Sequence, residues 1–245
     1  MNSDQDIIPI LKLALRYYRE GNLDYAKYVY QHMLSIDPQS ADALHLLGVS
    51  SYQSGQYEVA VNLITQAIQI DPTQPVFFTD LGNAFQKQEK LEESVQAYRK
   101  AIQIQPDYAE AHFNLGNSLR EQEKLEESVL AFQKVIQIQP NYAESYFNLG
   151  NSLREQGKLE ESIEVYQQAI TIRPNYPEAY SNLGIVLKEQ GRLKESIEAY
   201  QQAIIIQPQF AKAYYNLGIV LKEQGRLKES IEVYQQAITI QPDYA

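Results

Sequence analysis

The feature that most constrains this chain is a 34-residue repeat. The triplet Asn-Leu-Gly begins at Asn114, and it recurs 34 residues later at Asn148 and again at Asn182 and Asn216. A fixed period of this length is typical of architectures in which each repeat packs on its neighbours and cannot bury its apolar face alone. Carried along the whole chain, the register gives seven repeats, with positions numbered 1 to 34: 7–40, 41–74, 75–108, 109–142, 143–176, 177–210 and 211–244.

Glycine and proline punctuate every repeat at fixed positions. The 11 glycines fall only at positions 8 and 15, and a proline stands at position 32 of each repeat. Between these positions apolar residues recur at helical spacing, as at Leu115 and Leu119 and again at Val129, Phe132 and Val135. Glycine suits a helix C-cap and proline ends a helix. Each repeat is therefore predicted to be two helices joined by a turn.

The glycines at position 8 lie inside the first predicted helix of each repeat. Each costs about 1 kcal/mol relative to alanine there, so their recurrence needs a packing reason. We expect the two helices of a repeat to approach closely at this point, and the alanine or serine at position 20 fits that expectation. At position 15, Glu89 and Glu123 replace glycine. Either these glutamates strain the turn, or the turn does not need a positive φ.

The residues around position 33 predict how the first helices begin. Asp107, Asn141 and Asn175 precede three of these helices, and a glutamate follows three residues later in each case. This is the pattern of a capping box, in which the two side chains bond each other's backbone N–H groups. We expect these residues to cap the helices.

Composition and charge limit which kinds of partner and which cellular location fit this chain. The formal charge of −10 argues against nucleic acid or an anionic membrane as the main partner. The longest aliphatic run, 203–206, is far too short to span a bilayer. Residues 1–6 are acidic, unlike a secretory signal, and are expected to form a flexible tail. The expectation is a cytoplasmic protein.

No arrangement of residues predicts catalysis. The absence of cysteine excludes disulfides, thiolate metal sites and cysteine nucleophiles. The histidines form no metal-binding pair, and His45 is interpreted as an isolated residue on the polar side of a first helix. Phosphate loops and nucleophile elbows do not occur. We therefore predict that this chain alone is not an enzyme and that it has no cofactor, no catalytic residue and no metal.

The repeat resembles the tetratricopeptide repeat family across residues 7–244. It has Leu at position 7, Gly at 8, Ala or Ser at 20, an aromatic residue at 24, Ala at 27 and Pro at 32, as in Tyr98 and Ala101. The departures are His112 at the aromatic position 4 and the glutamates at position 15. The resemblance implies an all-α fold, a right-handed superhelical α-solenoid of seven helix-turn-helix repeats, whose concave groove binds a protein or peptide.

One face of the first helices is the candidate groove. At about 100° per residue, positions 2, 5, 6, 9, 12 and 13 lie opposite the core positions 4, 7, 8 and 11. A carboxamide can donate and accept at once, so a row of asparagines could hold an extended peptide backbone. The same asparagines could instead bond one repeat to the next, and the basic residues could be solvated surface. The candidate residues are Asn83, Asn114, Asn117, Asn148, Asn151, Asn182, Asn216, Phe113, Phe147, Tyr215, Arg120, Arg154, Lys188 and Lys222.

A second binding mode of the family, the dicarboxylate clamp, does not fit. It needs a lysine and an arginine at positions that Phe147 and Asn216 occupy here, although Asn151, Asn182 and Lys212 match its other groups. A carboxylate-terminated tail is therefore not the expected ligand.

The repeats most resemble the arms of O-GlcNAc transferase and SPINDLY-type glycosyltransferases. The resemblance lies in the consensus Ala-Glu-Ala-x-x-Asn-Leu-Gly-Asn and in the segment 41–48. In that family an asparagine ladder binds substrate protein for a separate catalytic domain. Here position 6 is Lys12, Leu46 or Asp80 in the first three repeats, so a ladder would cover only the last four. Two hypotheses follow: a free-standing scaffold of a bacterial complex, or the recruiting arm of a larger transferase.

The end of the chain repeats a junction between repeats. Residues 241–245 match 105–109, after which another repeat follows. We expect Ala245 to begin a truncated eighth repeat. The alternative is a short protein whose exposed last repeat pairs with another molecule, including end-to-end self-association.

Overall fold

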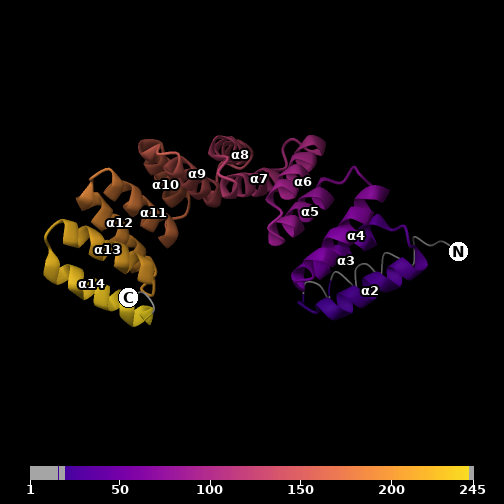
Figure 1. Ribbon diagram of the computed structural model, residues 1–245, viewed down its shortest axis with the longest axis horizontal. Coiled ribbons are helices and arrows are strands. Elements are labelled where there is room, and N and C mark those ends of the chain that lie inside the picture. Colours follow the sequence, from indigo (N-terminus) through magenta and orange to yellow (C-terminus); the bar gives the residue numbers. More distant parts are fainter. Residues whose placement is uncertain (1–15, 17–19, 243–245) are drawn as a thin grey trace. The chain divides into compact units, whose positions relative to one another are not determined.

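The computed structural model describes residue 16 and residues 20–242, and all regular structure in that part of the chain is helical (Figure 1). The expected N-terminal tail, most of 7–19 and Ala245 lie outside the described residues. The helices are α2 (Leu23–Ile36), α3 (Ala41–Gln53), α4 (Tyr57–Ile70), α5 (Pro75–Lys87), α6 (Leu91–Ile104), α7 (Ala109–Glu121), α8 (Leu125–Ile138), α9 (Ala143–Glu155), α10 (Leu159–Ile172), α11 (Pro177–Glu189), α12 (Leu193–Ile206), α13 (Ala211–Glu223) and α14 (Leu227–Ile240).

These helices keep a constant register. Every first helix occupies positions 1–13 and every second helix positions 17–30 of the 34-residue period. The chain forms two compact units, one up to Gln122 and one from Glu123. Within each unit the two helices of a repeat pack together, as α5 packs on α6 and α9 on α10, and each second helix also packs on the first helix of the next repeat. The expected all-α solenoid of stacked helix-turn-helix pairs is confirmed.

The glycine at position 8 makes room for a ring. A Cβ added to Gly150 would lie 2.6 Å from Cε1 of Tyr166, at position 24 of the same repeat, and one added to Gly184 would lie 2.8 Å from Cε1 of Tyr200. The serine at position 20 joins the same contact, because Ser162 Oγ donates to the Gly150 carbonyl at 2.8 Å. The expected close approach of the helix pair is confirmed, and the residue that needs the space is the aromatic one.

The turn at position 15 requires a left-handed backbone. Gly157 has φ +76°, and Glu89 and Glu123 adopt the same conformation with φ of 61° and 59°. The interpretation that glutamate marks a turn without positive φ is therefore wrong. An L-residue in this region costs roughly 1–2 kcal/mol because its Cβ crowds the following carbonyl oxygen.

The expected capping boxes are wrong. The N-cap residues of α7, α9 and α11 are Tyr108, Tyr142 and Tyr176, and none of these tyrosine side chains makes a capping hydrogen bond. At the start of α11 the N-cap Tyr176, one residue after the expected cap Asn175, is 9% exposed and packs on the ring of Phe147. Burying an aromatic side chain is worth about 1.5–3 kcal/mol, more than a cap at about 1 kcal/mol.

The last helix exposes the flank that every earlier repeat covers. Ile231 of α14 is 56% exposed, whereas its counterpart Ile197 of α12 is 6% exposed because α13 packs on it. The expectation of end-to-end association remains a prediction.

Among the described helices, none is both long and apolar enough to cross a membrane.

Replacing the strained glutamate tests the turn. Glu89→Gly should raise the free energy of unfolding by up to about 1 kcal/mol, because relief of the backbone strain exceeds the extra entropy of unfolded glycine. Gly157→Glu should lower it by a similar amount. The measurement is urea unfolding followed by circular dichroism.

The control is Glu198→Gly, an exposed position inside α12, which should cost about 1 kcal/mol. A loss of stability in Glu89→Gly as large as in this control would contradict the assignment of strain.

Candidate functional site

The candidate residues all lie on the first helices α5, α7, α9, α11 and α13. Within each of the two units, we call the surface formed by positions 2, 5, 6, 9, 12 and 13 of the first helices the polar face. Asn151 is buried, whereas Tyr215 and Lys222 are exposed, and the other candidates are half-buried. Most candidate side chains on this face are therefore in contact with neighbouring residues and are only partly accessible to a ligand.

Asparagines of successive repeats are hydrogen bonded to each other. In the first unit, Asn83 Oδ1 accepts from Asn114 Nδ2 at 3.0 Å and from the Tyr98 hydroxyl at 2.8 Å. Position 9 of one repeat is thus joined to position 6 of the next and to the tyrosine at position 24. We call this arrangement the Asn–Tyr–Asn triad.

The second unit contains the same triad. Asn151 Oδ1 accepts from Asn182 Nδ2 at 2.8 Å and from the Tyr166 hydroxyl at 2.7 Å. The alternative in which these asparagines bond one repeat to the next is therefore correct for two atoms, Nδ2 at position 6 and Oδ1 at position 9. The Oδ1 atoms of Asn114 and Asn182 take no part in the triads.

The remaining asparagines differ. Asn148 donates from Nδ2 to the Glu144 carbonyl of its own helix at 3.0 Å, and Asn117 lies half-buried at position 9 of α7. Asn216 Nδ2 is buried without a hydrogen-bond partner. The cause is Ile185, which occupies position 9 of the preceding repeat and offers no acceptor. A buried donor left unsatisfied costs about 1–3 kcal/mol.

The aromatic residues at position 5 lean against the core. The ring centroid of Phe147 is 5.1 Å from that of Tyr176 and 6.0 Å from that of Tyr166. Phe113 is also half-buried. Tyr215 is 39% exposed, with its ring centroid 5.7 Å from that of Tyr234. Of the three predicted aromatic contacts, Tyr215 presents the most surface to a ligand.

Among the basic residues at position 12, Lys188 reaches the next repeat. Lys188 Nζ lies 3.2 Å from Glu223 Oε1, at position 13 of the following repeat, and both side chains are partly exposed. Arg120 and Arg154 are half-buried and Lys222 is exposed. Ion pairs at such exposure are worth about 0–1 kcal/mol. A ligand could therefore replace the Lys188–Glu223 pair at little cost in free energy.

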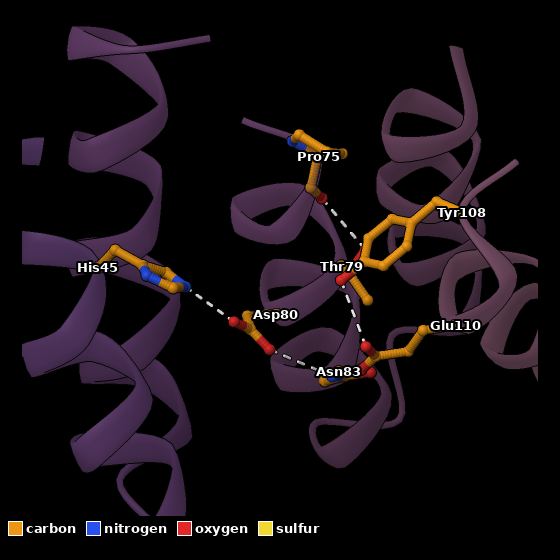
Figure 2. Close-up of polar contacts among 7 residues, drawn as sticks. All are labelled: His45, Pro75, Thr79, Asp80, Asn83, Tyr108 and Glu110. Atoms are coloured by element: carbon orange, nitrogen blue, oxygen red, sulfur yellow. Dashed lines mark hydrogen bonds and ion pairs between the residues drawn. The ribbon is translucent and has the colours of Figure 1, made fainter. Parts of the chain in front are cut away.

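Figure 2 shows a polar cluster on the face of the first unit. His45 Nε2 lies 2.7 Å from Asp80 Oδ2, and Asp80 Oδ1 accepts from Asn83 Nδ2 at 3.5 Å. His45 is 8% exposed, with its ring centroid 4.4 Å from that of Phe77. The interpretation of His45 as isolated is therefore wrong. Asp80 replaces the asparagine of position 6, and its carboxylate contacts His45 of the preceding repeat and the Asn83 amide of its own helix.

The same cluster places a tyrosine beside a carboxylate (Figure 2). The Tyr108 hydroxyl donates to Glu110 Oε2 at 3.2 Å, and Thr79 Oγ1 donates to the Pro75 carbonyl at 3.1 Å. Burial, together with the charge of Glu110, raises the pKa of Tyr108 to about 12. The Tyr108 hydroxyl is neutral at physiological pH and acts as the hydrogen-bond donor to the Glu110 carboxylate.

Two features were not predicted from the sequence. The first is that the hydroxyls of Tyr98 and Tyr166, at position 24, reach asparagines of the polar face. The pairing of His45 with Asp80 joins position 5 to position 6 of the next repeat, 35 residues apart. A search for complementary polar residues at separations of 31 and 35 would have found both the triads and this pair.

The family is established by sequence. Models described as TPR repeat or tetratricopeptide repeat match almost the whole length, at residues 17–79, 82–119, 116–157, 150–191, 186–225 and 211–244. This chain belongs to the tetratricopeptide repeat family. Among curated protein sequences, none matches it.

Solved structures agree with this fold. A crystal structure of MamA is 24% identical with a TM-score of 0.63, covering 66% of this chain and 95% of that one. YrrB, described as a TPR protein with an unusual peptide-binding site, is 24% identical with a TM-score of 0.61 over 74% of this chain and 93% of its own.

A third likeness spans more of the chain at lower identity. The C-terminal part of a TPR repeat-containing protein from Cytophaga hutchinsonii is 13% identical with a TM-score of 0.77, covering 95% of each chain. These likenesses establish the fold alone. The finer resemblance to the arms of O-GlcNAc transferase and SPINDLY-type enzymes is not among them and remains a hypothesis.

The triad can be tested by removing one hydroxyl. Tyr166→Phe should lower the free energy of unfolding by about 0.5–1.5 kcal/mol, because it removes a buried hydrogen bond to Asn151. Tyr200→Phe is the matched control, because Ile185 provides no acceptor in that repeat. Denaturant unfolding of both variants should show the difference, and equal losses would contradict the triad.

Proposed function

We propose that this chain binds an extended segment of another polypeptide along the polar face of its first helices. The observation that carries the proposal is the geometry of the triads. Asn114 and Asn182 are each held through Nδ2, by Asn83 and Asn151, which leaves Oδ1 as an acceptor for a backbone N–H. An amide fixed in this way loses little side-chain entropy when a ligand binds.

The chemistry of the face favours a peptide backbone over a particular sequence. Carboxamides complement backbone amides whatever side chains the partner carries. Each bond nets only about 0.5–1.5 kcal/mol, so affinity must come from several repeats acting together. Tyr215 and Lys222, which are both exposed, can add contacts to the partner's side chains.

The role of this chain is then to hold a partner in a scaffold, with no chemistry of its own. The peptide-binding site ascribed to YrrB supports this class of function for a related fold. Recruitment of a substrate protein for a transferase is the alternative, and it would use the same asparagines. The two hypotheses differ only in what is attached to the chain, so a transferase domain in the same open reading frame would favour the second.

The polar face can be tested with peptides displayed on phage. Random peptides would be selected on the intact chain, and synthetic copies would be titrated against the variant Asn114→Ala/Asn182→Ala. A peptide bound in either unit loses the acceptor of that unit, so binding should weaken about 2- to 10-fold. The control is Gln201→Ala/Gln202→Ala, on the exposed side of α12, which should bind normally.

Circular dichroism would establish that both variants keep their helices. Selected peptides that bind the asparagine variant as tightly as the parent, or that depend on Gln201 and Gln202, would remove the proposal.

A further inference from the structure

The apolar side of the first helix is less covered in the third repeat than in the others. The leucine at position 7 is buried in repeats 2 and 4 to 7, whereas Leu81 of α5 is half-buried. The leucine at position 11 is buried in repeats 4 to 7, whereas Phe85 of α5 is half-buried. Positions 4, 7 and 11 lie opposite the polar face at 100° per residue. This apolar surface is therefore distinct from the one proposed to hold a peptide backbone.

A cavity of about 490 Å³ lies on this side of the third repeat, lined by residues of α5 and α6. The residues that line it are of two kinds: apolar residues that are buried or half-buried form its floor, namely Phe78, Leu81, Phe85 and Ala97, and exposed polar residues form its rim, namely Glu93, Gln96, Arg99, Lys100 and Gln103. An apolar pocket with a polar rim is typical of a surface that anchors a bulky side chain of a partner.

The sixth repeat has a smaller cavity at the corresponding positions, with a volume of about 410 Å³. There Leu183 and Leu187 are buried, and Gln167 of the preceding second helix contributes to the lining. The counterpart of Gln167 before the third repeat is Thr65, a shorter side chain that does not line the cavity. A wall of the sixth-repeat cavity is thus missing in the third repeat, where the apolar floor is less covered.

The rim of the third-repeat cavity is basic. Positions 25 and 26 are Arg99 and Lys100, and the third repeat alone among the seven has a basic residue at both positions. Lys100 Nζ donates to the neutral amide oxygen of Gln103 at 3.1 Å. Glu93 is the one acid of the lining, so two cations stand against one carboxylate.

The rim of the sixth-repeat cavity has the opposite character. Positions 25 and 26 are the neutral Gln201 and Gln202, and the charged residues of the lining are Glu195 and Glu198. The two cavities therefore share a place in the repeat and differ in charge. A partner group that combines an apolar body with a negative charge is complementary to the third-repeat cavity alone.

We propose that the third-repeat cavity is a second docking site, which takes a bulky apolar side chain flanked by carboxylates on a partner protein. The apolar side chain packs on Leu81 and Phe85, and the carboxylates lie against Arg99 and Lys100. This site goes beyond the proposed function, because it uses neither the asparagines nor any other residue of the polar face. The chain would then hold two segments at once, on opposite sides of its first helices.

The test uses the intact chain and three short peptides. Acetyl-Glu-Phe-Glu-amide carries both features, acetyl-Lys-Phe-Lys-amide reverses the charge, and acetyl-Glu-Ala-Glu-amide lacks the apolar anchor. The readout is the ¹H–¹³C NMR signals of the Leu81 and Ala97 methyl groups. We expect a saturable shift with the first peptide, a dissociation constant about 2- to 30-fold higher with the second, and no saturation with the third.

Filling the cavity tests the apolar anchor. Ala97→Leu places a larger side chain in the floor, and the fold accepts leucine at this position in the second repeat, at Leu63. It should abolish saturable binding of acetyl-Glu-Phe-Glu-amide, as followed on the Leu81 methyl signals. The matched control is Ala199→Leu, which fills the sixth-repeat cavity and should leave binding unchanged.

Neutralising the rim tests the charge and does not alter the core. Arg99→Gln/Lys100→Gln gives the third repeat the side chains of Gln201 and Gln202, and it should abolish the preference for glutamate over lysine peptides. Lys90→Gln/Lys158→Gln is the control, because it removes the same charge at exposed positions outside the cavity lining. The rim variant decides the question if Ala97→Leu does not fold.

The proposal is overturned if acetyl-Glu-Phe-Glu-amide gives no saturable shift, or if the alanine or lysine peptide binds as tightly. It is also overturned if binding persists in folded Ala97→Leu or if the preference survives in the rim variant. Self-association of the chain, seen by light scattering and lost in Ala97→Leu, would assign the cavity to a second copy instead. Binding here should be unchanged in Asn114→Ala/Asn182→Ala, so failure of this site is distinct from failure of the polar face.

Discussion

The contact between the glycine at position 8 and the ring at position 24 determines the rest of each repeat that has a tyrosine there. The ring of Tyr166 occupies the space where a side chain on Gly150 would begin, and it is completely buried. At that separation Ser162 reaches the Gly150 carbonyl, so the helix pair is held by packing and by a hydrogen bond together. Glycine is kept inside these helices, against its helix propensity, because any larger residue would displace the ring.

The position of the ring also determines which groups are ordered on the polar face. With its ring against glycine, Tyr166 brings its hydroxyl to Asn151, and Asn151 holds Asn182 of the next repeat. The core contact thus prearranges an amide on the surface proposed to bind a peptide. Where Ile185 replaces asparagine, glycine and tyrosine are retained, and Asn216 Nδ2 is buried without a partner. The glycine–tyrosine contact therefore does not require an asparagine at position 9.

The period was enough to predict the helices, the turns and the close approach at position 8, because these depend on residues within one repeat. It was not enough for the caps, because α7, α9 and α11 each begin one residue later than the capping pattern predicted, with a tyrosine at the N-cap. It also did not reveal the partners of His45 or Asn83, which lie one repeat away and depend on side-chain geometry. The sequence left open whether the asparagines bond repeats or ligands. The structure assigns the first role to their triad atoms, and the second role rests on the peptide experiment.

The most direct test of the central contact is the free energy of unfolding of Gly150→Ala, measured by urea denaturation. A methyl group at this position would lie 2.6 Å from the ring of Tyr166, so overpacking should lower the stability by about 1–3 kcal/mol. Helix propensity acting alone would raise it by about 1 kcal/mol. A variant as stable as the parent, or more stable, would contradict the account.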